Sequence, residues 1–373
     1  MSLASIVADK PFVRATVTNF FFILCLNSFI LLPLHIHAQG GTEVEIGLVM
    51  GLFNAVGIVA QPFAGPWVDA IGRRPFMLAG PVFFAVSALL AAAASSIPVL
   101  AAVRVLQGLG FSMFFVASYS YVIDLVPPAR RGWALGLYGA SGLLATAVAP
   151  VGSEWVIRRW GFRPLFVVAA GLAAVTFAFV WRLQGGHRGP SLTVRASLFE
   201  RGGVAELFHR PMAVTLFFGL GAGTVWVFLP TFAEGLGVQS LALFYTAYAV
   251  AAIGVRVFGG RLLDTHGRRA VIVPAMFMQA MATALLAMLG FLVSRTSPTP
   301  VLPVVFVAGL LSGARTAFSI PASPPSSPTR RPRRGAASWW ASSAACSSSA
   351  RRRARSPSAT SRTPPATPSC GAC

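Results

Sequence analysis

The sequence predicts an all-α protein that crosses a lipid bilayer many times. Hydrophobic residues make up 55% of its 373 residues and charged residues only 11%, against about a quarter charged in an ordinary soluble domain. Most of the chain divides into apolar segments long enough to cross about 30 Å of hydrocarbon as helices. Their length, and the absence of a two-residue alternation, favour helices over barrel strands.

Ten apolar segments follow one another along the chain. The first comes directly after Lys10 and Arg14. Its apolar run is too long for a signal peptide and no small-x-small cleavage site follows, so we expect an uncleaved helix. The ten predicted helices are 15–36, 46–68, 76–97, 98–123, 133–157, 164–183, 211–233, 239–260, 270–293 and 300–320.

The distribution of basic residues predicts the orientation of these helices. The formal net charge is +20, and nine arginines lie between Arg330 and Arg362. Of the other 21 basic residues, 14 fall on one side of the predicted membrane, four on the other and three within spans. Because basic residues concentrate on the cytoplasmic side, we expect a cytoplasmic N-terminus. Lys10 is the only lysine and the other 29 basic residues are arginine, which points to a GC-rich genome; we expect a bacterial membrane.

A charged motif occurs twice at the same place in two halves of the chain. The frame G-x-x-x-D-x-x-G-R-R begins at Gly65, within GPWVDAIGRRP, and again 195 positions later at Gly260, within GRLLDTHGRR. Each copy joins the second and third predicted helices of its half. The repeat therefore predicts two related bundles in parallel orientation. The expected domains are a six-helix bundle at 1–183, a cytoplasmic loop at 184–210, a partial four-helix bundle at 211–320 and a disordered tail at 321–373.

The motif suggests a latch at the membrane surface. Gly65 and Gly72 permit a sharp turn between helices. Asp69, Arg73 and Arg74 can pair with each other, with helix ends or with charges on the other half. Contacts of that kind form in one conformation and break in another.

These motifs resemble those of the major facilitator superfamily, the twelve-helix secondary transporters. LAAVRVLQGLG, from Leu100, is similar to the pattern of the family's fourth helix, and DLVPPARRGWALG, from Asp124, to its loop between helices four and five. The fifth-helix antiporter motif is partly present: Gly136 and Pro150 fit. The departures are Ala145, Ala149, Ser153 and Glu154. The resemblance implies two pseudo-symmetric six-helix bundles, of which about ten of twelve helices are visible.

What the resemblance implies for function is alternating access to a central site. The expected gate residues of the first half are Gly65, Asp69, Gly72, Arg73, Arg74, Asp124, Arg130 and Arg131. Those of the second half are Gly260, Asp264, Gly267, Arg268 and Arg269.

Arg104 is the candidate for proton or substrate coupling, with Gln107 and Gly108 beside it in the same pattern. A cation within a span is costly and usually faces a cavity or a partner. The alternative is that Arg104 extends outward to the interface. Asn27, in the middle of the first predicted helix, either binds a ligand or joins helices by a hydrogen bond.

No enzyme, cofactor or metal is expected. The sequence has no P-loop, GxSxG or HExxH motif, so no catalytic residue is assigned. His35 and His37 fall in the predicted outer interface, and the terminal CGAC has no second cysteine pair for a metal.

The last 53 residues depart from the family pattern. Residues 321–373 contain no Leu, Ile, Val, Phe, Asp, Glu or Lys. A shift of reading frame explains this composition, because the neighbouring frame permits apolar codons and the D-x5-R-R-G spacing of Asp124 and Gly132. The alternative is a genuine basic tail that binds anionic lipid or RNA.

The expected function is proton-coupled efflux of a small organic solute or drug. The expected partners are that solute, protons and the lipid bilayer, without nucleic acid, and the expected state is a monomer in the plasma (inner) membrane. One alternative is a truncated, transport-inactive member of the family. Another, from a different class, is a membrane-anchored protein with a basic lipid- or nucleic-acid-binding tail.

Overall fold

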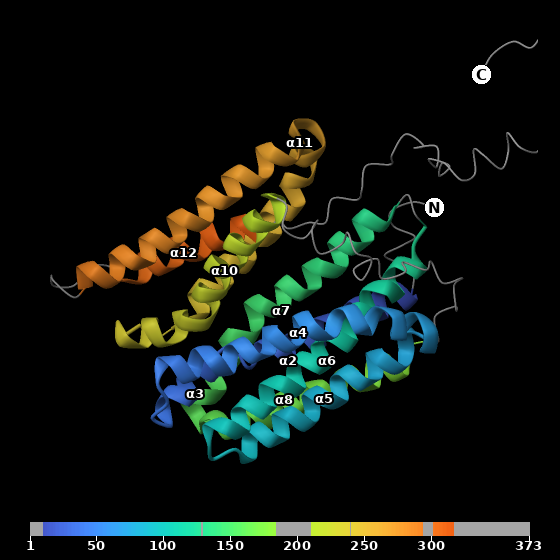
Figure 1. The fold of residues 1–373 in the computed structure, drawn as a ribbon, viewed down its shortest axis with the longest axis horizontal. Coiled ribbons are helices and arrows are strands. Elements are labelled where there is room, and N and C mark those ends of the chain that lie inside the picture. Colours follow the sequence, from blue (N-terminus) through green and yellow to red (C-terminus); the bar gives the residue numbers. More distant parts are fainter. Residues whose placement is uncertain (1–9, 128–129, 184–209, 239, 294–300, 317–373) are drawn as a thin grey trace, which may run out of the picture. The chain divides into compact units, whose positions relative to one another are not determined.

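The computed structural model describes residues 10–127, 130–183, 210–238, 240–293 and 301–316, and no strand occurs within them (Figure 1). Side chains at 62, 210–218, 256–272, 292, 293 and 316 lie outside this description. The chain divides into two compact units, Met1–Ile320 and Pro321–Cys373. All of the described residues belong to the first, and their helical architecture confirms the predicted fold class.

The described helices of the N-terminal half follow the predicted order. The first predicted helix is broken: α2 ends at Asn27 and α3 begins at Leu32, with Pro33 in its first turn. Proline fits there because first-turn N–H groups have no partner within the helix. The bounds are α2 Lys10–Asn27, α3 Leu32–Ala38, α4 Glu43–Ile71, α5 Arg73–Ala93, α6 Ile97–Leu125, α7 Arg131–Trp160 and α8 Phe162–Trp181.

The start of α4 is fixed by a reciprocal cap. The Thr42 hydroxyl accepts from the backbone N–H of Glu45 at 3.3 Å, and the Glu45 carboxylate accepts from the backbone N–H of Thr42 at 2.8 Å. This capping box satisfies two N–H groups that the helix itself leaves free.

A single residue, Gly72, joins α4 to α5. Its φ is 110°, a conformation that residues with a β-carbon rarely adopt. The sequence predicted a connection of about seven residues, and this was wrong. α4 continues through Gly65 and Asp69 to Ile71, because one glycine is enough to reverse the chain. Asp69 and Arg73 therefore lie on the helix ends that flank the turn.

The described helices of the C-terminal half are α10 (Arg210–Gly235), α11 (Ala242–Val293) and α12 (Val301–Thr316). The 52 residues of α11 would form a straight helix about 78 Å long. Phe244 and Leu289 nevertheless belong to one buried cluster, so α11 doubles back, as its ribbon shows in Figure 1. Its two limbs correspond to the helices predicted at 239–260 and 270–293.

Length and composition agree with a membrane protein. Within the described residues, seven helical segments are long and apolar enough to cross a membrane, with α2 and α3 counted together. Two shorter apolar helices, Ala242–Val255 and Val301–Arg315, accompany them.

Glycines bring α4, α5 and α6 into close contact. A β-carbon on Gly108 of α6 would lie 2.8 Å from the carbonyl oxygen of Phe53 on α4. One on Gly110 would lie 3.0 Å from the carbonyl oxygen of Gly80 on α5. Small residues at these crossings allow helix backbones to approach in lipid, which gives Gly108 a packing role.

We expect Gly108→Ala to destabilise the protein by about 1–3 kcal/mol, because the Phe53 backbone must move to admit the methyl group. Gly171→Ala on α8 is the matched control, since a β-carbon there meets nothing within 4 Å. Thermal unfolding in detergent, monitored by size exclusion, measures the difference in stability between the two variants. Equal melting temperatures for the two variants would contradict the packing assignment.

Candidate functional site

Charged residues from α4, α5 and α6 meet beside the turn at Gly72. The Arg73 guanidinium lies 2.6 Å from the Asp124 carboxylate (Nε to Oδ2) and 3.7 Å from that of Asp69 (Nη2 to Oδ1). The Nε–H does not point at an acceptor, so the shorter contact is an ion pair rather than an aligned hydrogen bond. The Arg73 side chain is 13% exposed and that of Asp124 30%, which leaves the pair partly screened by solvent.

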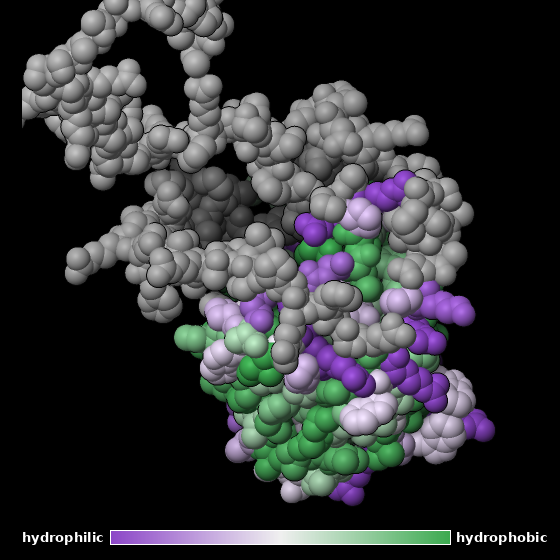
Figure 2. Space-filling view, turned by 90° about the vertical axis from the view of Figure 1, so that its right-hand side faces the viewer, coloured by the Kyte–Doolittle hydropathy of each residue, from purple (hydrophilic) through white to green (hydrophobic). Residues whose placement is uncertain are grey.

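The neighbouring arginines reach backbone carbonyls. Arg74 donates to the carbonyl oxygen of Trp181 at 2.6 Å and lies over its ring, which ties α5 to the end of α8. Arg131 donates to the carbonyl oxygen of Ile123 at 3.2 Å, and Arg130 lies just before α7. Figure 2 looks onto the right-hand side of Figure 1, where α4 meets α5, and hydrophilic residues gather there among hydrophobic ones. We call this the charged end of the N-terminal half.

The second copy of the motif lies within α11. Its side chains, those of Gly260, Asp264, Gly267, Arg268 and Arg269, are outside the described residues. Their part in a gate therefore stays a prediction.

Arg104 is buried in α6, with 4% of its surface exposed. Its Nη1 donates to the Gln107 side-chain oxygen at 3.0 Å, its Nη2 contacts the Met50 sulfur at 2.6 Å, and its guanidinium lies 5.6 Å from the centre of the Phe53 ring. The alternative in which Arg104 extends to the interface is not the conformation observed. All three neighbours are uncharged.

A central cavity of about 1060 Å³ lies against Arg104. Its walls come from α2, α4, α6 and α10, and include Asn27, Asn54, Thr224 and Trp226. Asn27 also donates to the Thr146 hydroxyl on α7 at 2.9 Å, so it both joins two helices and lines the cavity. The cavity has the size and mixed lining of a small-molecule site.

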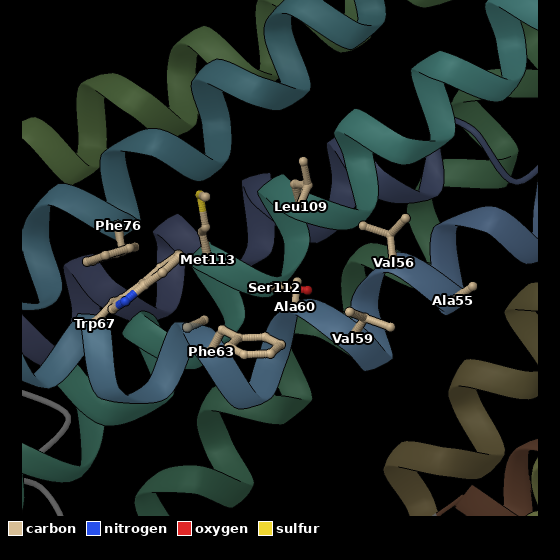
Figure 3. A pocket seen from close by; sticks show the side chains of 11 residues that line it. Ala55, Val56, Val59, Ala60, Phe63, Trp67, Phe76, Leu109, Ser112 and Met113 are labelled. Carbon is tan, nitrogen blue, oxygen red and sulfur yellow. The ribbon is translucent and has the colours of Figure 1, made fainter. Parts of the chain in front are cut away.

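A second hollow, of about 450 Å³, lies between α4 and α6 (Figure 3). Phe63, Trp67 and Phe76 line it together with aliphatic side chains. Its one hydroxyl, that of Ser112, already donates to the carbonyl oxygen of Gly108 at 2.8 Å. Apart from this hydroxyl and the indole N–H of Trp67, the lining of the hollow is apolar, so the central cavity is the better candidate for recognising a polar solute.

The end of α7 far from the charged end joins the two halves. Glu154 lies 23 residues beyond Arg131 in one continuous helix, about 35 Å along its axis. Its carboxylate accepts from the backbone N–H of Ala242 at 2.7 Å and from the Ser240 hydroxyl at 3.0 Å. Ala242 begins α11, so the carboxylate caps the positive end of that helix.

Apolar packing surrounds this contact. One buried cluster combines Ile30 and Leu31 of the N-terminal half with Leu229, Leu241 and Phe244 of the C-terminal half. His37 Nδ1 also lies 3.4 Å from the Glu234 carboxylate (Oε2), and this contact joins the halves in an exposed position. We call this contact region the closed end.

Sequence reasoning noted Glu154 only as a departure from the fifth-helix motif. No local signal identifies its partner, because the N-terminus of α11 is 88 residues away. In the same helix, Gly136 has open space where a β-carbon would be, and Pro150 is buried inside α7. Within the described part of the chain, no group of three or more His, Cys, Asp or Glu could hold a metal ion.

The model of the Major Facilitator Superfamily matches residues 15–350. The chain belongs to this family, and it is a multi-pass membrane protein.

Curated relatives include an export protein and multidrug proteins. The chain is 23% identical to the staphylopine export protein of Staphylococcus aureus, over 69% of this chain and 67% of that protein. It is 24% identical to multidrug resistance protein 2 of Bacillus subtilis, over 63% of this chain and 61% of that protein. It is 32% identical to the multidrug transporter MdfA of Yersinia pestis, over 39% and 36%. The chain thus spans about two thirds or less of these relatives.

Solved structures share the fold. The nucleoside transporter NupG superposes with a TM-score of 0.65 at 14% identity, covering 83% of this chain and 80% of that one. The xylose transporter XylE from E. coli, in a partially occluded inward-open conformation, gives 0.58 at 15% identity, covering 82% and 85%. At these identities the likeness is one of fold.

Proposed function

We propose that this chain is a secondary active transporter that exports a small organic solute in exchange for protons. The observation that carries the proposal is a buried arginine, Arg104, against a central cavity between two halves of a Major Facilitator Superfamily fold. The staphylopine export protein among its relatives favours efflux. We place it as a monomer in a bacterial inner membrane, with its N-terminus in the cytoplasm.

The two ends of the bundle support alternating access. At the closed end, Glu154 and the shared apolar cluster hold the halves together. The charged end carries Arg73 and Asp124. In the second state of the cycle, in which this end is closed, these charges are available to hold the halves together. Exchange between the states requires the Glu154 contact to break. Its hydrogen bonds, with a charged acceptor, are worth about 1.5–3 kcal/mol each, within the range that shifts a two-state population.

Flux in proteoliposomes tests the proposal. Vesicles that contain the purified chain are loaded with a fluorescent organic solute. An inward proton gradient should accelerate the exit of the solute from these vesicles, and a protonophore should abolish the acceleration. Movement equal to that of protein-free vesicles, for a panel of anionic, neutral and cationic solutes, would contradict it.

The composition of residues 321–373 favours one alternative, a family member that inserts but does not transport. The stretch is rich in Arg, Ser and Pro and lacks Leu, Ile, Val and Phe, a composition that does not predict a membrane-spanning helix. The alternative predicts correct insertion with no flux. Sequencing the DNA across codons 315–335 and repeating the assay on the frame-restored chain distinguishes the two.

We expect Glu154→Gln to open the closed end. Glutamine retains an acceptor oxygen but loses the negative charge that interacts favourably with the N-terminus of α11. The ratio of closed to open molecules should therefore fall by about tenfold, equivalent to about 1.4 kcal/mol. Val44 and Leu243 are exposed, so spin labels can be attached to the variants Val44→Cys and Leu243→Cys. Double electron–electron resonance between the two labels then reports the distance between the halves.

Glu43→Gln is the matched control, because Glu43 is an exposed carboxylate in the first turn of α4. Its distance distribution should equal that of the parent. An unchanged distribution for Glu154→Gln as well would contradict the latch role.

A further inference from the structure

We propose that the central cavity selects anionic solutes, in particular apolar or aromatic carboxylates, and rejects lipophilic cations. The inference rests on the proposed function and names its substrate class. The charge of Arg104 in the cavity wall and the contacts of its side chain carry it.

The cavity wall carries one sign of charge. Arg104 is the one charged residue among the described residues that line it. Its polar companions, Asn27, Asn54 and Thr224, are neutral, and the remaining lining is aliphatic, aromatic or glycine. Aromatic rings alone could accept an organic cation, but the guanidinium in this lining repels a cation and attracts an anion.

Arg104 lacks an internal counter-charge within the described structure. Its contacts are the neutral Gln107 oxygen, the Met50 sulfur and the Phe53 ring, and its Nε has no hydrogen-bond partner. The described ion pairs lie elsewhere, at the charged end and the closed end. Burying a cation without a counter-charge is unfavourable. A bound anion would supply that counter-charge, so it would both relieve the cost of burying Arg104 and attract the guanidinium.

The rest of the cavity suits the body of an amphiphile. Trp226 lines it, and its ring is held by Tyr245 and Tyr248 at centroid distances of 5.3 and 5.1 Å. Such a fixed aromatic wall offers stacking and apolar area. Phe53, which lines the cavity beside Arg104, adds a second ring. A ligand with an aromatic body and a carboxylate matches both features.

Three probes of one shape separate charge from size. The full chain is placed in nanodiscs of zwitterionic phosphatidylcholine, which reduces adsorption of ions to the lipid, with empty nanodiscs as baseline. Calorimetry measures the binding of 4-butylbenzoate, 4-butylbenzamide and 4-butylbenzylammonium at pH 7. We expect the benzoate to bind at least about tenfold more tightly than the ammonium ion, the scale of one charge interaction in a partly buried site, with the benzamide between them.

Variants assign the selectivity to the arginine. Arg104→Gln should abolish the preference, whereas Arg104→Lys, which keeps the charge, should retain its direction. Arg159→Gln is the matched control, since Arg159 is exposed at the end of α7. Size exclusion tests whether each variant is folded. If Arg104→Gln does not fold, the test rests on Arg104→Lys, which should still bind the benzoate more tightly than the ammonium ion.

Two results would overturn the inference: a parent protein that binds the ammonium ion as well as the benzoate or fails to bind the benzoate, or a folded Arg104→Gln variant that keeps the preference. If proteoliposome flux occurs with a preference for cations, this inference fails and the transport proposal stands. If the benzoate binds selectively without flux, the transport proposal fails and the inference stands.

Discussion

Replacing Arg104 by alanine is expected to abolish solute flux while leaving membrane insertion intact. The side chain is buried beside the central cavity and touches α4 through Met50 and Phe53. Its loss removes the positive charge that faces the solute and with it the candidate residue for proton or substrate coupling. We expect at least about a hundredfold loss of rate, the equivalent of about 2.7 kcal/mol. Proteoliposome flux per inserted molecule measures it.

Two comparisons make this result specific. Arg104→Lys should retain part of the flux, since a lysine keeps the charge but not the planar fork of donors. Arg159→Ala, at an exposed position of α7, should transport as the parent does. Near-normal flux in a folded Arg104→Ala variant would show that this arginine serves packing alone.

Reversing one charge of the Arg73–Asp124 pair is expected to cause the second largest loss. Arg73→Asp places two carboxylates within a few ångströms of each other, and Asp124→Arg does the same with two guanidinium groups. Because the pair is only partly buried, we expect each change to cost about 1–3 kcal/mol and flux to fall by at least about tenfold. The combined variant restores opposite charges and should recover much of the flux.

A double-mutant cycle measures this coupling. The sum of the single effects should exceed the effect of the double variant by about 0.5–3 kcal/mol, the range for residues in direct contact. Asp69→Asn provides an internal comparison, since Asp69 lies farther from Arg73, at 3.7 Å, and should couple to it more weakly. Additive losses would show that the two charges act separately.

The helical fold could be predicted from the sequence because lipid leaves few options. Apolar runs of sufficient length have to form helices to satisfy their backbone groups, so each described helix lies where a run predicted one. Arg104 could be singled out for the same reason, since a charge inside such a run stands out. The proximity of Asp124 to Arg73 was expected from the family resemblance, not from the spacing of the two residues in the sequence.

Contacts between distant segments could not be predicted. Nothing near Glu154 in the sequence identifies Ala242 as its partner, and the contact arises only when α7 meets the start of α11. The one-residue turn at Gly72 was missed because Gly65 and Gly72 look equivalent in sequence, whereas only Gly72 takes a positive φ. The central cavity depends on how α10 lies against α2 and α4, which composition does not specify.

Sidedness of the two charged motifs is the most direct test of two related halves with a shared gate. In a background without native cysteines, single cysteines are placed at Ile71 and at His266, the equivalent position 195 residues later, with Val44 at the other end of α4 as reference. A membrane-impermeant maleimide should label positions 71 and 266 only from the cytoplasmic face and position 44 only from the opposite face. Labelling of positions 71 and 266 from opposite faces would contradict the parallel repeat and the transporter built on it.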